Sequence, residues 1–96
     1  MQASRDIVIS NALGLHARPA MQFVDLANQF RSNITVHKPA NNAEPAVDVD
    51  GKSVMQMITL EATQGTTLRI EATGDDATTA IEQLAGLVDD KFGEEQ

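Results

Sequence analysis

The amino-acid sequence predicts a small α+β fold with the element order βαββαβα, in which one antiparallel sheet carries all of its helices on one face. Four short segments alternate apolar residues with polar ones, as half-buried strands do. Three other segments place apolar residues at helical spacing. Four such strands and three such helices pack most economically as two layers, with the sheet against the helices.

The first strand and the first helix are expected on either side of a loop. Ile7 and Ile9 recur at every second position, which indicates a strand over residues 6–10. The loop NALGLH follows, and a helix of about three turns begins at Ala17. The apolar residues that give this helix its spacing are Ala20, Phe23, Val24 and Ala27.

The middle of the chain predicts two strands and a short helix. Residues 33–37 and 46–50 alternate, and the segment KPANNAEP between them has two prolines, two asparagines and no periodicity, which indicates a long turn. Ser53 is a favoured N-cap residue and precedes an apolar stretch, so we expect a short helix over residues 54–60. Its helical spacing rests on Val54, Met57 and Ile58.

The last third of the chain predicts a strand followed by a helix. Residues 67–72 alternate most regularly of all. Gly74 supplies a break, and Asp75 and Asp76 are expected to provide an acidic cap for the final helix. The apolar stripe of this helix comprises Ala77, Ala80, Ile81, Leu84, Leu87 and Val88.

Composition limits the classes of partner. A chain of 96 residues fits one domain, residues 1–96, with one modest core. Its 7 basic and 14 acidic residues give a net charge of −7, which repels nucleic acids and anionic membranes. No apolar stretch approaches the roughly 18 residues that span a bilayer, and no cysteine is present. We therefore expect a cytoplasmic protein without membrane insertion or nucleic-acid binding.

The segment GLHARPA places a histidine where the first helix begins. Pro19 marks that beginning, because proline is tolerated in the first turn of a helix, where its missing N–H has no helical partner. His16 is then the cap, and the N–H groups of Ala17 and Arg18 are free to bind a phosphate. A neutral imidazole can attack phosphorus, and an arginine can hold the phosphoryl oxygens. The pattern therefore predicts a phosphorylation site on His16.

Simpler interpretations of both histidines remain open. His16 can be a surface cap residue, with Arg18 a solvated charge. His37 lies in a predicted strand without a cysteine or a third ligand near it, so we expect a structural role there and no metal ion.

Two motifs resemble one known family. GLHARPA, between a strand and a helix, is similar to the active-site signature of HPr, the histidine-containing phosphocarrier family of the bacterial phosphoenolpyruvate-dependent sugar phosphotransferase system. GKSVMQMITL, residues 51–60, resembles the regulatory-serine helix of the same family. The two motifs occur in the right order, and the likeness runs from about Ile7 to about Val88.

The resemblance implies a fold and a site. It implies an open-faced β-sandwich with strand order 1-4-2-3 and phosphorylation of His16 at Nδ1, assisted by Arg18. It also implies a carrier without catalysis or a cofactor of its own, which takes the phosphoryl group from enzyme I and passes it to sugar-specific permease components. We expect a monomer.

Ser53 and its helix have two interpretations. The resemblance implies that Ser53 matches the serine that an HPr kinase phosphorylates in some bacteria. As an N-cap alone, Ser53 would have a purely structural role worth about 1 kcal/mol. A docking patch beside His16 and the basic residues Arg18 and Lys52 is also expected. The predicted docking residues are Leu15, Met21, Val54, Met55 and Ile58, whereas Met57 is expected to face the sheet.

Three other functions compete with the sugar carrier. One is a regulatory phosphorelay, nitrogen-linked or carbon-regulatory, that uses His16 without sugar transport. Another is a non-catalytic βαβ binding module, since a fold alone does not settle a function. An autonomous enzyme is the weakest, because the segment before Gly51-Lys52-Ser53 has Ala46 where a phosphate-binding loop needs a glycine.

Overall fold

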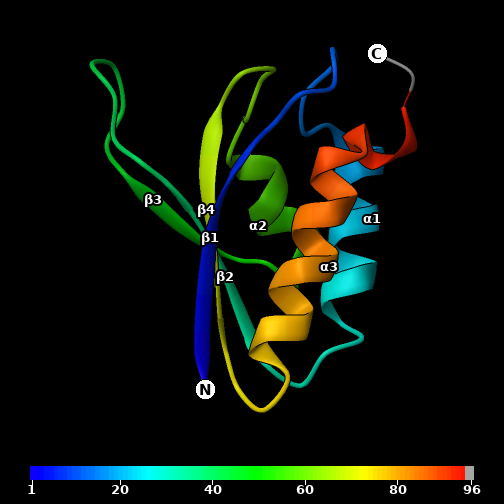
Figure 1. Cartoon of the computed structure of the whole chain (residues 1–96). Helices are drawn as coiled ribbons and strands as arrows, with labels where there is room; N and C mark the ends of the chain where they lie inside the picture. Colours follow the sequence, from blue (N-terminus) through cyan, green and yellow to red (C-terminus); the bar gives the residue numbers. More distant parts are fainter. Residues whose placement is uncertain (95–96) are drawn as a thin grey trace.

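A computed structural model describes residues 1–94 and shows the predicted order of elements, βαββαβα (Figure 1). A single turn of 3-10 helix, η1, follows the last helix. The elements are β1 (Gln2–Val8), α1 (Ala17–Ala27), β2 (Asn33–Lys38), β3 (Val47–Asp50), α2 (Val54–Thr59), β4 (Thr67–Thr73), α3 (Ala77–Asp89) and η1 (Lys91–Gly93).

The four strands form one sheet in the order β1-β4-β2-β3, as the family resemblance implied. Every pair is antiparallel. Ile70 of β4 lies opposite Arg5 of β1 on one side and Val36 of β2 on the other. All three helices cover the same face of the sheet (Figure 1), so the two-layer prediction is confirmed.

The first strand differs most from its predicted range. It begins at Gln2 instead of residue 6, because its pairing with β4 runs from Gln2 opposite Thr73 to Val8 opposite Thr67. Most of its early side chains are exposed, which leaves no alternation to detect in the sequence. Ile9 lies just beyond the strand, but it is buried and bonds through its backbone to residues 65 and 66.

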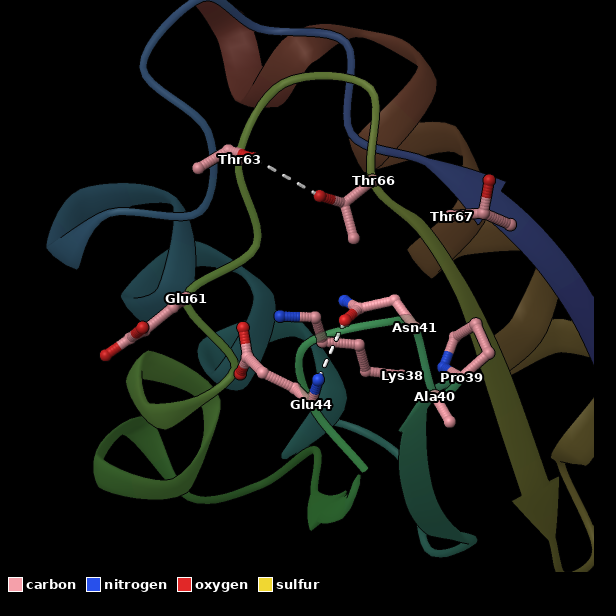
Figure 2. A pocket seen from close by; sticks show the side chains of 9 residues that line it. All are labelled: Lys38, Pro39, Ala40, Asn41, Glu44, Glu61, Thr63, Thr66 and Thr67. Atoms are coloured by element: carbon pink, nitrogen blue, oxygen red, sulfur yellow. Dashed lines mark hydrogen bonds between the residues drawn. The ribbon is translucent and has the colours of Figure 1, made fainter. Parts of the chain in front are cut away.

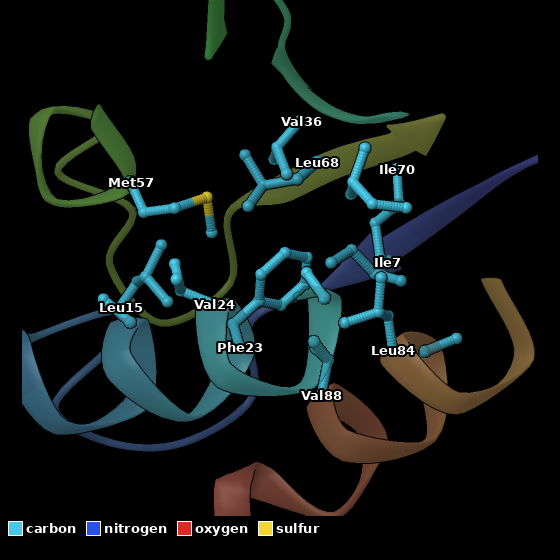
Figure 3. Packing of buried hydrophobic residues seen from close by; sticks show 14 of the residues in the cluster. Ile7, Leu15, Phe23, Val24, Val36, Met57, Leu68, Ile70, Leu84 and Val88 are labelled. Atoms are coloured by element: carbon cyan, nitrogen blue, oxygen red, sulfur yellow. The ribbon is translucent and has the colours of Figure 1, made fainter. Parts of the chain in front are cut away.

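The core lies between the sheet and the helices, with the Phe23 ring near its centre (Figure 3). Met57 of α2 is buried against it, which confirms that this methionine faces the sheet. Alternate residues of the strands supply one side of the core, because successive side chains of a strand point to opposite faces. The residues labelled in Figure 3 are Ile7, Leu15, Phe23, Val24, Val36, Met57, Leu68, Ile70, Leu84 and Val88.

Asp76 is the N-cap residue of α3, as expected, and its carbonyl accepts the first helical bond from Ala80, but its side chain bonds elsewhere. Its side chain makes no bond to the first turn of α3. The carboxylate instead accepts hydrogen bonds from the backbone N–H groups of Arg31 and Ser32 and from the Ser32 hydroxyl. These bonds, the hydroxyl foremost, lower the pKa of Asp76 to about 2. As an ionised carboxylate, Asp76 therefore links the loop after α1 to the start of α3.

The segment after α3 turns back toward the start of α1. Lys91 and Phe92 adopt φ values of 55° and 56°, and Gly93 follows with 78°. The left-handed region costs an ordinary residue roughly 1–2 kcal/mol. Phe92 is buried in the core, and burial of such a side chain contributes about 1.5–3 kcal/mol, which offsets much of that cost. The turn delivers Glu94 to the loop that precedes α1.

Among residues 1–94, no helix has both the length and the apolar character needed to cross a membrane.

Candidate functional site

The loop between β1 and α1 is held in one shape by backbone bonds. Gly14 has a φ of 71°, which suits glycine, and its N–H donates to the carbonyl of Asn11 at 3.1 Å. The N–H of Leu15 donates to the carbonyl of Ala62 at 2.8 Å, which ties the loop to the segment after α2. The buried Asn11 side chain donates to the Gly14 carbonyl at 2.7 Å. These bonds hold the backbone on the N-terminal side of His16 in place.

His16 is the N-cap of α1, as predicted. Its backbone is extended, with φ −85° and ψ −170°, and its carbonyl accepts the first helical bond from Ala20 at 3.0 Å. Its side chain makes no capping bond. Within residues 1–94 no acceptor bonds to the N–H of Ala17 or of Arg18, and Pro19 lies in the first turn. The His16 side chain is 36% exposed, so a partner can reach it.

A carboxylate from the segment after α3 contacts the ring of His16. Glu94 Oε2 lies 2.7 Å from His16 Nε2, and Asn11 Nδ2 donates to Glu94 Oε1 at 2.8 Å. The pKa of Glu94 is lowered, chiefly by the bond from Asn11 and further by His16, so the carboxyl is ionised near neutral pH. No local pattern in the sequence singles out Glu94, which lies 78 residues from His16.

Of the two basic residues expected near His16, only Arg18 lies there. Arg18 is exposed, and its charge contributes to the lowered pKa of Glu94. The prediction for Lys52 was wrong, because its Nζ donates to the carbonyl of Phe30 at 2.7 Å, beyond the C-terminal end of α1. The site is therefore a partly exposed histidine at a helix start, with one arginine and one carboxylate near it.

Similarity to known proteins shows the family to which this chain belongs. A family model described as "PTS HPr component phosphorylation site" matches residues 3–90. The chain belongs to the HPr family. It is a phosphocarrier of the phosphotransferase system and not itself an enzyme, and its family partners are enzyme I and the permease components.

Individual relatives cover nearly the whole chain. Phosphocarrier protein NPr of Proteus mirabilis is 37% identical over 95 residues, 99% of this chain and 100% of that protein. Phosphocarrier protein HPr of Haemophilus influenzae is 42% identical over 85 residues, 88% of this chain and 93% of that one. The crystal structure of HPr-C-His from Thermoanaerobacter tengcongensis superposes with a TM-score of 0.87 at 40% identity, covering 98% and 99% of the two chains. The HPr fold is thus shown by structure as well as by sequence.

Ser53 has the capping role that the sequence predicted. Its hydroxyl accepts a hydrogen bond from the N–H of Gln56 at 3.2 Å, at the start of α2. The adjacent Lys52 reaches Phe30, so Ser53 lies toward the end of α1 opposite to His16. A helix of eleven residues is about 16 Å long. The length of α1 therefore separates the Ser53 hydroxyl from the His16 imidazole in this HPr-family domain.

One of the predicted docking residues is not available to a partner. Leu15 is only 6% exposed and packs into the core beside Val24 and Met57 (Figure 3), so that prediction was wrong. An apolar residue directly before the cap is instead a core anchor that sets the entry of the loop into α1. The others reach solvent, since Met21, Met55 and Ile58 are exposed and Val54 is partly buried. Leu13, which was not predicted, is 74% exposed and lies in the same loop as His16.

The long turn after β2 borders a hollow of about 500 Å³ that does not include His16 (Figure 2). Asn41 stabilises the turn, because its side chain accepts from the N–H groups of Ala43 and Glu44. His37, in β2, bonds to Asp48 of β3 across the strand pair. The Asn41 bonds and the His37–Asp48 bond together stabilise the β2–β3 hairpin. The hollow is lined by Lys38, Pro39, Ala40, Asn41, Glu44, Glu61, Thr63, Thr66 and Thr67.

Proposed function

We propose that His16 is the phosphoryl acceptor of this phosphocarrier, loaded by phosphorylated enzyme I and unloaded by sugar-specific permease components. The observation that supports the proposal is the position of His16 as a partly exposed N-cap, directly before the free N–H groups of Ala17 and Arg18. No described residue bonds to its Nδ1 atom, so one ring nitrogen is open to attack phosphorus.

The groups around His16 suit a phosphoryl group that is bound only briefly. The free N–H groups of Ala17 and Arg18 and the positive end of the α1 dipole attract phosphoryl oxygens. The Arg18 guanidinium adds charge from an exposed position. No buried ion pair or metal ion is needed, and such moderate stabilisation on an open loop allows transfer in both directions.

A phosphorylation assay tests the function. The full chain is incubated with phosphoenolpyruvate and its cognate enzyme I, and its mass is measured before and after treatment with acid and with base. We expect the mass of the chain to increase by that of one phosphoryl group, and we expect this group to be labile in acid and stable in base. The group should then pass to a permease component. Absence of any gain in mass would leave the non-catalytic binding module as the better account.

Replacing Arg18 with alanine is expected to slow phosphoryl transfer about 10- to 100-fold, because a charge that stabilises the transferred group is lost. The free energy of unfolding should change by no more than about 0.5 kcal/mol, since the side chain is exposed. Transfer rates and urea unfolding check both statements. Arg5→Ala, with the same change of charge on the distant strand β1, is the matched control. A large loss of stability with normal transfer would contradict the role.

A regulatory relay is the second candidate, because relatives of this chain bear two names, HPr and NPr. Both candidates use His16 in the same way and differ only in the acceptor. The phosphorylated chain is therefore offered to a sugar-specific permease component of the same bacterium. Fast transfer supports sugar transport, whereas a stable phosphorylated chain supports the relay.

Ser53 and the exposed residues of α2 are proposed as the regulatory part of the domain. A phosphate on Ser53, added by an HPr kinase, would lie at the start of α2 and place charge beside the apolar docking residues. Those residues are Met21, Val54, Met55 and Ile58. Added charge on this patch would weaken the docking of partners while the fold survives.

Replacing Ser53 with alanine is expected to reduce the free energy of unfolding by about 1 kcal/mol, because the bond to the Gln56 N–H is lost. The rate of His16 phosphorylation should not change, since the two sites lie toward opposite ends of α1. Thermal unfolding and the transfer assay measure the two effects. Ser4→Ala, at an exposed position of β1, controls for the loss of a hydroxyl elsewhere. Unchanged stability would mean that the capping bond contributes nothing.

The remaining properties follow from this role. We propose a single HPr-like domain over residues 1–96 that acts as a cytoplasmic monomer without a cofactor. The continuous core and the net charge of −7 support this view.

A further inference from the structure

The last described residue, Glu94, makes the contact that carries an inference beyond the proposed function. It lies outside residues 3–90, the part of the chain that the family model matches. Phe92, buried in the core, anchors the segment two residues earlier. The left-handed turn through Lys91 and Phe92 aims the backbone back at the His16 loop (Figure 1). The position of Glu94 is therefore built by a turn that the chain would otherwise avoid.

Asn11 fixes the orientation of the Glu94 carboxylate. Its amide NH₂ donates to Gly14 O at 2.7 Å and to Glu94 Oε1 at 2.8 Å, so both of its donors are used. Its own oxygen, Asn11 Oδ1, is buried and has no partner among residues 1–94. Buried polar atoms without a partner are rare because they are costly. The Asn11 amide therefore donates to Glu94, while its own oxygen is left without a hydrogen-bond donor.

The hydrogen-bonding roles then settle the tautomer of His16. An ionised carboxylate can only accept, so the 2.7 Å contact requires a hydrogen on His16 Nε2. A neutral imidazole has one N–H, and its lone pair is consequently on Nδ1.

We propose that Glu94 is a positioning residue for phosphoryl transfer: it holds the Nε2–H of His16 and so directs the lone pair of Nδ1 at phosphorus. The inference rests on the proposed role of His16. In the transfer, a bond forms between Nδ1 and phosphorus while the bond from phosphorus to the donor breaks, and its electron pair returns to the donor. No proton leaves the ring, which becomes positively charged, and the Glu94 carboxylate stabilises that charge. In the reverse direction the ring departs as neutral imidazole, a good leaving group.

Glu94→Gln gives the sharpest test. The NH₂ group of Asn11 is held by Gly14, so it continues to require an acceptor, and the oxygen of Gln at position 94 must face it. The NH₂ of that glutamine then faces His16 Nε2 and donates to it. The tautomer reverses, with the hydrogen on Nδ1, and transfer from enzyme I should fall at least about 100-fold. Glu94→Ala leaves Nε2 without a partner, and a smaller loss of about 10-fold is expected.

The tautomer is measured by long-range ¹H–¹⁵N spectra of the full chain labelled in histidine, at a pH at which His16 is neutral. We expect Nε2–H in the unaltered protein, Nδ1–H in Glu94→Gln and a mixture in Glu94→Ala. Glu82→Gln, with the same change of charge at an exposed position of α3, should change neither the tautomer nor the rate. An unaltered tautomer and rate in Glu94→Gln would overturn the inference while phosphorylation of His16 stands. A protein that is not phosphorylated at His16 would instead refute the proposed function, and the spectra would still decide whether Glu94 holds the ring.

Discussion

Replacing His16 with alanine is expected to abolish phosphorylation by enzyme I completely. The side chain removed is the proposed nucleophile, and alanine has no atom that can accept the group. The chain has two histidines, His16 and His37, so His37→Ala is a natural control. His37 bonds to Asp48 within the sheet, and its loss should leave phosphorylation unchanged. Intact mass of both variants after incubation with phosphoenolpyruvate and enzyme I measures the effect.

The loss in the His16 variant should not come from unfolding. The ring is partly exposed and makes one side-chain hydrogen bond, to Glu94, so we expect the variant to unfold close to the temperature of the unaltered protein. Circular dichroism on the same samples checks this. A folded His16→Ala protein that still gains an acid-labile phosphoryl group would refute the assignment, because another side chain would then be the acceptor.

Replacing Gly14 with alanine is expected to damage both the fold and the site. An added Cβ would lie 2.6 Å from the carbonyl oxygen of Ala62 and 2.9 Å from the Cα of Thr63, and both are backbone atoms that cannot rotate away. The φ of 71° adds the strain of a left-handed residue. We expect a loss of more than about 2 kcal/mol in the free energy of unfolding, together with slower transfer because the loop that holds His16 must move.

Gly65→Ala separates the two causes. Gly65 also has a positive φ, 90°, but a Cβ there meets nothing within 4 Å. This variant should lose only about 1 kcal/mol through backbone strain, and it should transfer at a normal rate. Urea unfolding and transfer rates of both variants measure the difference. Equal losses of stability in the two variants would mean that the contact of the loop with Ala62 and Thr63 is not close.

Much of this fold could be predicted because its periodic segments are strong. Residues 67–72 and the first helix follow their patterns closely, since each has one buried face. Pro19 and Ser53 marked the starts of α1 and α2 through the chemistry of caps and first turns, which acts between near neighbours in the sequence. His16 was found in the same way, as the residue before such a start.

What the sequence did not reveal depends on contacts between distant segments. Glu94 reaches His16 only because Phe92 is buried and the backbone turns left-handed after α3, and no local pattern signals that turn. Asp76 is the N-cap residue of α3, but its side chain bonds to the loop after α1 and not to its own helix, for a similar reason. Leu15 could be mistaken for a docking residue because a single apolar side chain in a loop has no periodicity to show which way it points.

The most direct measurement of the central claim identifies the atom that carries phosphorus. The histidine-labelled chain is phosphorylated by enzyme I, and its four ring nitrogens are assigned by nuclear magnetic resonance. We predict that phosphorus is bonded to Nδ1 of His16, that Nε2 of the same ring keeps its hydrogen, and that both nitrogens of His37 stay unchanged. Phosphorus on any other atom, or no phosphorylation at all, would contradict the account.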